Sequence, residues 1–173
     1  GFPREVAINL STLGLAVLAQ GRTAQALRYL QESVSRYRQM QFAGELGWAL
    51  GGLALVQEAD GQTKNACDTL VEALHIAAKT HSMFAMVYSL SAIVIILSRK
   101  GKQESAMLVH RIARHQGLQQ NSRWYADLIG DKMSQFWEAL AEEQRAEIEA
   151  SASQHTPFSI IPEVLALLEE ENT

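Results

Sequence analysis

The sequence is poor in the residues and runs that build disulfides and membrane spans. Cys67 is the only cysteine among 173 residues, so no internal disulfide can form and a reducing compartment is favoured. Unbroken apolar runs are short: one of the longest, residues 92–97, falls far below the roughly 18 residues that a membrane helix needs. We therefore expect a cytoplasmic protein with no segment in a membrane.

Neither sign of charge dominates, and the motifs of common enzyme classes are missing. The chain has 15 lysines and arginines against 19 aspartates and glutamates, a net charge of -4 that argues against direct nucleic-acid binding. The basic stretch 99–102, with Arg111 and Arg114, is interpreted as a solvated surface. There is no GxxxxGKS/T phosphate loop, no GxGxxG loop and no HExxH metal motif. We expect no cofactor, no metal and no catalytic residues.

What the sequence does contain is a repeat with a period of 40 residues. Three classes of position recur at this spacing: a glycine, a small residue and a large apolar residue. They are Gly21, Gly61 and Gly101; Ala26, Ala66 and Ala106; and Leu10, Leu50 and Leu90. Small residues thus fall on small residues, and large apolar residues on large ones, in three successive copies. Chance would rarely produce this pattern, so the repeat predicts the architecture.

Each copy predicts two helices joined at the repeated glycine. Leu10, Leu13 and Val17 are spaced as one apolar stripe of a first helix. The glycine suits the left-handed position that ends such a helix, and Thr23 and Thr63 are expected to N-cap the second helix. Small residues at positions 26 and 33 let the two helices approach closely. Such a hairpin cannot bury its own apolar face, so neighbouring copies must stack.

The repeat also gives structural interpretations to the reactive side chains. His110 occupies the position of Leu30 and Leu70, which predicts a partly buried histidine at a helix contact and not a metal ligand. Cys67 falls in an apolar position of the repeat, which predicts a small buried residue and not a nucleophile. An all-helical enzyme is therefore the least favoured class of function.

The spacing within each copy resembles the tetratricopeptide repeat, or TPR. In the first copy, Leu13-Gly14, Gly21 and Ala26 stand where that motif has a Leu-Gly pair, a turn and a small residue. The period is longer than the TPR average, and the proline that usually ends the second helix is missing. Both features resemble the long-helix TPR arrays in the C-terminal part of bacterial LuxR-type regulators and related STAND ATPases. The stretch 44–54 is similar to those arrays as well.

The resemblance implies an all-α fold, namely a TPR-like α-α superhelix closed by C-terminal capping helices. Residues 1–120 would form three TPR-like hairpins of a right-handed solenoid, and residues 121–173 would be the capping helices of the same domain. Within the cap, residues 141–152 are an acidic helix candidate, and Pro162 is placed in the first turn of a short last helix. End units of this kind cover the last open face of a solenoid.

In TPR arrays the first helix of each hairpin lines the concave side, which here gives an apolar and aromatic lining with small residues between large ones. The predicted lining comprises Ile8, Ser11 and Leu15 from the first copy; Trp48, Gly51, Gly52 and Leu55 from the second; and Tyr88, Ser91, Ile95 and Arg99 from the third. The functional hypothesis is a groove for a protein, a peptide or an apolar small molecule, with Trp48 and Tyr88 as anchors and the glycines leaving room for another chain. The alternative is that the protein's own terminal helices fill this face.

The resemblance further implies a non-catalytic sensor module of a larger bacterial signalling or transcription regulator, whose ATPase and DNA-reading parts would lie outside the chain. The chain opens with Gly1-Phe2-Pro3, and we interpret it as a fragment of that larger protein. A scaffold or self-association module without a small ligand is the alternative function. A first hairpin without a neighbour would expose Val6, Leu10 and Leu13, an apolar patch that favours a homodimer through the N-terminal repeat.

Overall fold

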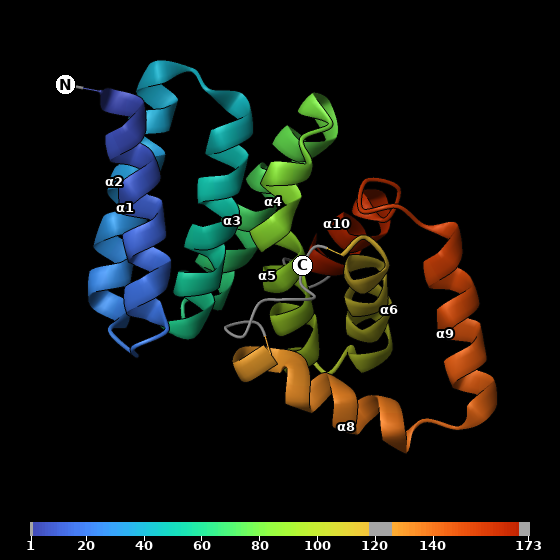
Figure 1. Ribbon diagram of the computed structural model, residues 1–173. Coiled ribbons are helices and arrows are strands. Elements are labelled where there is room, and N and C mark those ends of the chain that lie inside the picture. The colour runs from blue at the N-terminus through green and yellow to red at the C-terminus, as the bar shows by residue number, and fades with distance from the viewer. Residues whose placement is uncertain (1, 118–125, 170–173) are drawn as a thin grey trace. The chain divides into compact units, whose positions relative to one another are not determined.

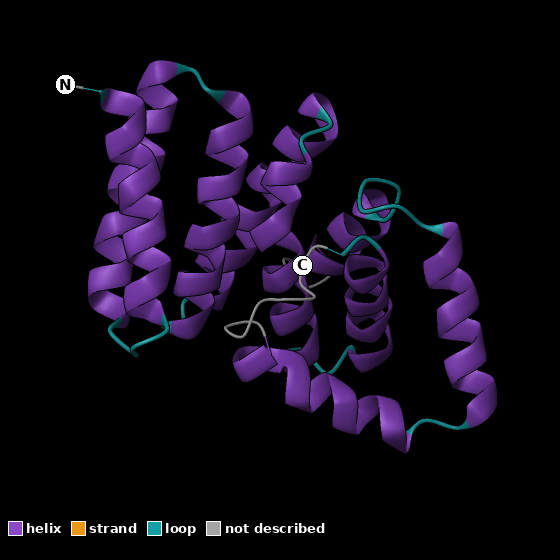
Figure 2. Ribbon diagram, viewed as in Figure 1, coloured by secondary structure: helices purple, strands orange, loops and turns teal. Residues whose placement is uncertain are grey.

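All regular structure in the described chain is helical. The computed structural model describes residues 2–117 and 126–169, and Figures 1 and 2 show helices joined by short loops, with no strand in these ranges. The all-α class predicted from the repeat is therefore confirmed for the described residues. None of their helices is long and apolar enough to cross a bilayer.

The chain divides into two compact units, residues 1–92 and 93–173, each with its own packed helices. The division falls within helix α5 (Met83–Arg99). The sequence instead placed a change from hairpins to capping helices at residue 120, and that position lies in the segment 118–125, outside the described residues.

The first unit consists of two helical hairpins followed by the first half of α5. One hairpin is α1 (Pro3–Leu18) with α2 (Thr23–Met40), and the other is α3 (Ala43–Ala59) with α4 (Thr63–Thr80). The two helices of each hairpin pack along one another (Figure 1), and α2 also packs against α3. The second hairpin thus stacks on the first, as the repeat predicts.

The repeated glycines end the first helix of each hairpin in the left-handed conformation. Gly21, Gly61 and Gly101 have φ angles of 74°, 77° and 76°, a region that glycine enters without the steric cost paid by other residues. The next residue closes the turn: the backbone N–H of Arg22 donates to the carbonyl oxygen of Val17 at 3.0 Å. The same bond follows the other two glycines, at 2.8 and 2.9 Å. This repeated helix end confirms the predicted position of the turns.

The threonines after these glycines are not the N-caps that the sequence predicted. Thr23 and Thr63 are the first residues of α2 and α4, and the N-caps are Arg22 and Gln62, neither of which makes a side-chain capping bond. The reason is that the turn at the left-handed glycine is short, so Arg22, the residue directly after Gly21, is already the N-cap of α2. Its carbonyl oxygen accepts the first hydrogen bond of the helix, from the backbone N–H of Ala26 at 3.0 Å.

Small residues bring the two helices of the first hairpin together. Ala26 is fully buried, and a Cβ added to Gly14 would lie 2.8 Å from Leu30 Cγ. Ser33 donates from its hydroxyl to the carbonyl oxygen of Ala7 at 2.8 Å, and its Oγ lies 2.7 Å from that of Ser11. The buried hydroxyls therefore satisfy one another and the backbone where α1 and α2 pack together. The predicted role of small residues at positions 26 and 33 is confirmed.

The second unit departs from the regular repeat. It comprises the rest of α5, then α6 (Gln103–His115), the π-helical turn η1 (Ala126–Gly130), α8 (Asp131–Ala139), α9 (Glu142–Gln154) and α10 (Ile161–Glu169). Helix α6 has 13 residues where α2 and α4 have 18, and it packs against α8 and α9. The acidic helix and the last helix with Pro162 in its first turn are present as predicted.

Candidate functional site: an aromatic cluster on α3 and α5

The structure buries most of the predicted groove lining. Ser11, Leu15, Trp48, Gly51, Gly52, Leu55 and Ser91 are buried, whereas Ile8, Tyr88 and Ile95 are half-buried and Arg99 is exposed. Ile95 and Arg99 belong to the second unit, and the other nine residues belong to the first. The site is therefore built from the residues of the first unit alone.

Neighbouring helices fill the space beside Gly51 and Gly52 of α3 and leave no room for another chain. A Cβ added to Gly51 would lie 2.8 Å from the backbone nitrogen of Ser89 on α5. A Cβ on Gly52 would meet Leu30 of α2 at 3.2 Å and Leu15 of α1 at 3.6 Å. The sequence hypothesis that these glycines open the groove is wrong at both positions, because the missing side chains admit the chain's own helices instead.

Three aromatic rings from α3 and α5 form a cluster. The rings of Trp48 and Phe84 are stacked, with centroids 4.9 Å apart and planes at 21°. The ring of Tyr88 lies 5.8 Å from that of Trp48 at an angle of 41°. Both separations are in the range of favourable aromatic pairs. The predicted neighbours Trp48 and Tyr88 are thus brought together, and we call the three residues Trp48, Phe84 and Tyr88 the aromatic cluster.

Exposure differs sharply within the aromatic cluster. Trp48 is only 6% exposed, so it belongs to the core and is not the open anchor that the sequence predicted. Phe84 is 50% exposed although its ring is stacked on Trp48. Tyr88 lies between these extremes, and burial raises the pKa of its phenol, which keeps it neutral. The residue that presents the cluster to solvent is therefore Phe84.

Sequence reasoning missed Phe84, although a signal was present. Phe84 precedes Tyr88 by four residues, so both side chains lie on one face of α5. The repeat hid this relation, because the equivalent positions hold Arg4 and Gly44, which show no aromatic or apolar preference. A search for aromatic pairs spaced by one helical turn would have found it.

No family model, curated protein or solved structure matches this chain. Among the described residues there is also no group of three or more His, Cys, Asp and Glu side chains that could hold a metal ion. Function is therefore inferred from the geometry of the described residues.

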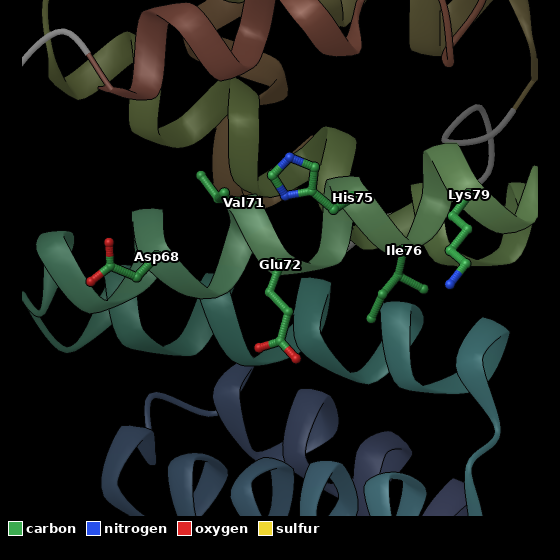
Figure 3. Close-up of a pocket in the computed structure, with 6 residues that line it drawn as sticks. All are labelled: Asp68, Val71, Glu72, His75, Ile76 and Lys79. Carbon is green, nitrogen blue, oxygen red and sulfur yellow. The ribbon is translucent and has the colours of Figure 1, made fainter.

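A depression of about 430 Å³ lies along the outer side of α4. Its lining is made up of Asp68, Val71, Glu72, His75, Ile76 and Lys79. All six residues come from this one helix and project in different directions (Figure 3). Glu72 also forms a salt bridge with Arg38 of α2, with 2.6 Å between Glu72 Oε2 and Arg38 Nη2. No second helix of the described chain contributes to the lining, so this depression is a weaker candidate than the aromatic cluster.

In the second unit a small cavity of about 150 Å³ lies between α6 and α8. The guanidinium of Arg111 lies 4.6 Å from the ring centroid of Trp137, and its Nε donates to Glu149 Oε2 at 2.7 Å. His115 Nε2 lies 2.7 Å from the other carboxylate oxygen of Glu149. The hydrogen bond from Arg111, followed by that of His115, holds the pKa of Glu149 below its usual range despite some burial. These contacts fasten α6 to α8 and α9.

We expect His110→Leu to reduce the loss of stability that acid causes. His110 is 7% exposed, and burial, followed by the charges of Arg114 and Arg111, lowers its pKa from 6.5 to about 4. The unfolded chain therefore gains a proton near pH 6.5 that the folded chain gains only at about pH 4. The free energy of unfolding consequently decreases as the pH is lowered from 6.5 to about 4. In urea unfolding the wild type should lose about 2 kcal/mol more than the variant as the pH is lowered across this range. Equal losses would contradict a buried neutral imidazole.

Proposed function

We propose that this chain is a non-catalytic binding module whose aromatic cluster anchors a protein, a peptide or an apolar small molecule. The observation that carries the proposal is that Phe84 is half exposed yet held in place by stacking on buried Trp48. A ring fixed in this way offers contact area with little further loss of conformational freedom. Rigid aromatic side chains of this kind are typical of binding hot spots.

The neighbourhood of Phe84 suits an apolar segment better than a charged one. Tyr88 adds a second, partly buried ring with a neutral phenol on the same face of α5. Gly44, one helical turn before Trp48 in α3, lies beside Ser82, which precedes Phe84 by two residues, with 3.4 Å between its added Cβ and Ser82 Oγ. An amphipathic helix or an extended peptide with a bulky apolar side chain would fit such a surface.

The wider context of this proposal is a TPR-like superhelix within a larger bacterial regulator. Hairpins that recur every 40 residues, with the same glycine turn at the end of the first helix, support a TPR-like array. The resemblance to the C-terminal arrays of LuxR-type and STAND regulators suggests that the module senses a ligand or partner in the cytoplasm. Direct DNA contact would then belong to another part of that protein, because the net charge of this chain is -4.

We expect Phe84→Ala to weaken partner binding at least about tenfold while leaving the fold nearly unchanged. Peptides selected for binding to the wild-type chain from a library of amphipathic sequences would serve as the probe, with dissociation constants measured by calorimetry. Phe42→Ala is the matched control, because Phe42 is 40% exposed but lies outside the aromatic cluster. The proposal would be refuted if the selected peptides bound Phe84→Ala as tightly as wild type. It would also be refuted if Phe42→Ala weakened their binding as much as Phe84→Ala does.

A scaffold or self-association module is the second candidate function, and the surface of α1 favours it. Val6 is 41% exposed and Leu13 49% exposed, whereas Leu10 is half-buried. An apolar stripe of this kind could pair two copies into a homodimer. Sedimentation of the wild-type chain beside Leu13→Asp distinguishes the two functions, because only self-association through α1 would be lost in the variant.

A further inference from the structure

The outer side of α1 carries a stripe whose equivalents elsewhere in the chain are buried. Asn9, Thr12, Leu13 and Ala16, at the spacing of one helix face, are all exposed. Forty residues later, Ala49, Gly52, Leu53 and Val56 are all buried in α3. A further forty residues on, Ser89, Ala92, Ile93 and Ile96 are buried in α5. The same face of the first helix is thus covered in two copies of the repeat and open in one.

The contacts of Gly52 identify what covers this face in the second copy. A Cβ added to Gly52 would lie 3.2 Å from Leu30, which belongs to α2, the second helix of the preceding hairpin. Helix α2 packs along α3, so the stripe that contains Gly52 is the surface on which a second helix lies. Leu30 itself is fully buried, wedged between Gly14 of its own hairpin and Gly52 of the next.

We propose that the stripe of Asn9, Thr12, Leu13 and Ala16 is a docking surface for the second helix of another helical hairpin of this type. The partner is an amphipathic helix with the pattern of α2, in which Ala26, Leu30 and Val34 lie on the buried side. Opposite Thr12 a residue smaller than Leu30 fits best, because Thr12 stands where Gly52 and Ala92 leave space. The proposal is independent of the binding role of the aromatic cluster.

A second copy of α1 fits this stripe less well than such a helix does. Where first helices of this chain meet, α1 contacts α3 through Leu15, and a Cβ on Gly52 would lie 3.6 Å from Leu15 Cδ2. Leu15 is buried and is not part of the exposed stripe. Moreover, the stripe is uncharged, so nothing in it opposes an apolar helix, and Asn9 can exchange hydrogen bonds with a polar side chain of that helix.

The test is to extend the full chain at its N-terminus with a second copy of residues 1–40. The junction Met40–Gly1 keeps the 40-residue period and puts Gly1 at the position of Gln41 and His81, whose φ angles are 58° and 48°. Glycine adopts this left-handed conformation readily, so the added hairpin can stack in register. We expect the melting temperature to rise by roughly 5 °C or more, and amide exchange in the original α1 to slow at least about tenfold.

Two variants of the extended chain, both in the original first hairpin, make the outcome decisive. Leu13→Asp should abolish the rise in melting temperature, and Thr12→Gly should increase it, because glycine restores the space that Gly52 gives to Leu30. An extended chain whose melting temperature does not rise, even with Thr12→Gly, would overturn the proposal. So would a tight dimer of the original chain that Leu13→Asp dissociates, since the occupant would then be a second copy. Phe84→Ala should leave the rise in melting temperature unchanged, so the stacking of the added hairpin can be judged separately from the proposed binding role of the aromatic cluster.

Discussion

Trp48→Ala is expected to lower the free energy of unfolding by about 3–5 kcal/mol. Trp48 is 6% exposed, its ring is stacked on Phe84 at 4.9 Å, and Tyr88 lies 5.8 Å away. Truncation to alanine removes the largest side chain of the aromatic cluster and leaves a cavity that fixed helices cannot close. The loss therefore combines the transfer energy of the indole with the cost of the cavity.

The measurement is urea unfolding followed by circular dichroism, because removal of a tryptophan alters the fluorescence signal. Trp48→Phe should cost less, since a phenyl ring keeps part of the stacking with Phe84. Phe84→Ala is the matched control within the same stack: Phe84 is 50% exposed, so its loss should cost only about 1 kcal/mol. A loss at Trp48 no larger than that at Phe84 would show that the indole is open to solvent.

This expectation reverses the role that the sequence assigns to Trp48. The repeat makes Trp48 and Tyr88 equivalent positions, and the resemblance to TPR arrays makes both of them lining residues, so Trp48→Ala should weaken binding more than folding. In the structure the two aromatic functions separate: Trp48 supports the cluster from within, and Phe84 presents it to solvent. A binding defect in Trp48→Ala would therefore follow from loss of the support beneath Phe84.

The features that the sequence predicted well are those fixed by local backbone geometry. The glycines at 21, 61 and 101 mark helix ends because only glycine adopts the left-handed conformation there at little cost. Ala26, Ala66 and Ala106 are fully buried because two helices meet at those positions. His110 is buried in the position of Leu30 and Leu70, so even a titratable residue follows the repeat. Such signals involve only neighbouring residues or one helix contact, and a 40-residue shift makes them visible.

The orientation of helices that are buried on all sides could not be predicted in this way. Every residue of α3 from Gly47 to Glu58 is buried, so apolar periodicity does not distinguish a core face from a groove face. Only the resemblance to TPR arrays therefore assigns the lining residues of α3 to a concave surface. The shortened α6 was also missed, because its register matches the repeat up to Ala113 and differs only in where the helix ends.

Close packing between α3 and α5 rests on two facing rows of small residues. Gly44, Gly47 and Gly51 lie on one side of α3, and Ser82, Ala85 and Ser89 are their partners at the start and in the first half of α5. A Cβ added to Gly47 would be 2.8 Å from that of Ala85, and one added to Gly51 would be 2.8 Å from the backbone nitrogen of Ser89. The second contact is the stricter, because a backbone atom cannot rotate away as a side chain can.

Gly51→Ala is therefore expected to destabilise the chain by about 3 kcal/mol, at the upper end of the cost of overpacking. Alanine in a helix interior normally gains about 1 kcal/mol over glycine, so a loss of this size would have the opposite sign to helix propensity. Gly44→Ala is the matched control in the same helix, because its added Cβ meets only the side chain of Ser82, with Oγ at 3.4 Å and Cβ at 3.9 Å, both ordinary contacts. Urea unfolding should show Gly44→Ala to be neutral or slightly stabilising. If Gly51→Ala behaved like Gly44→Ala, α5 would have to lie further from α3 than the structure places it, and the aromatic cluster between these helices would be looser as well.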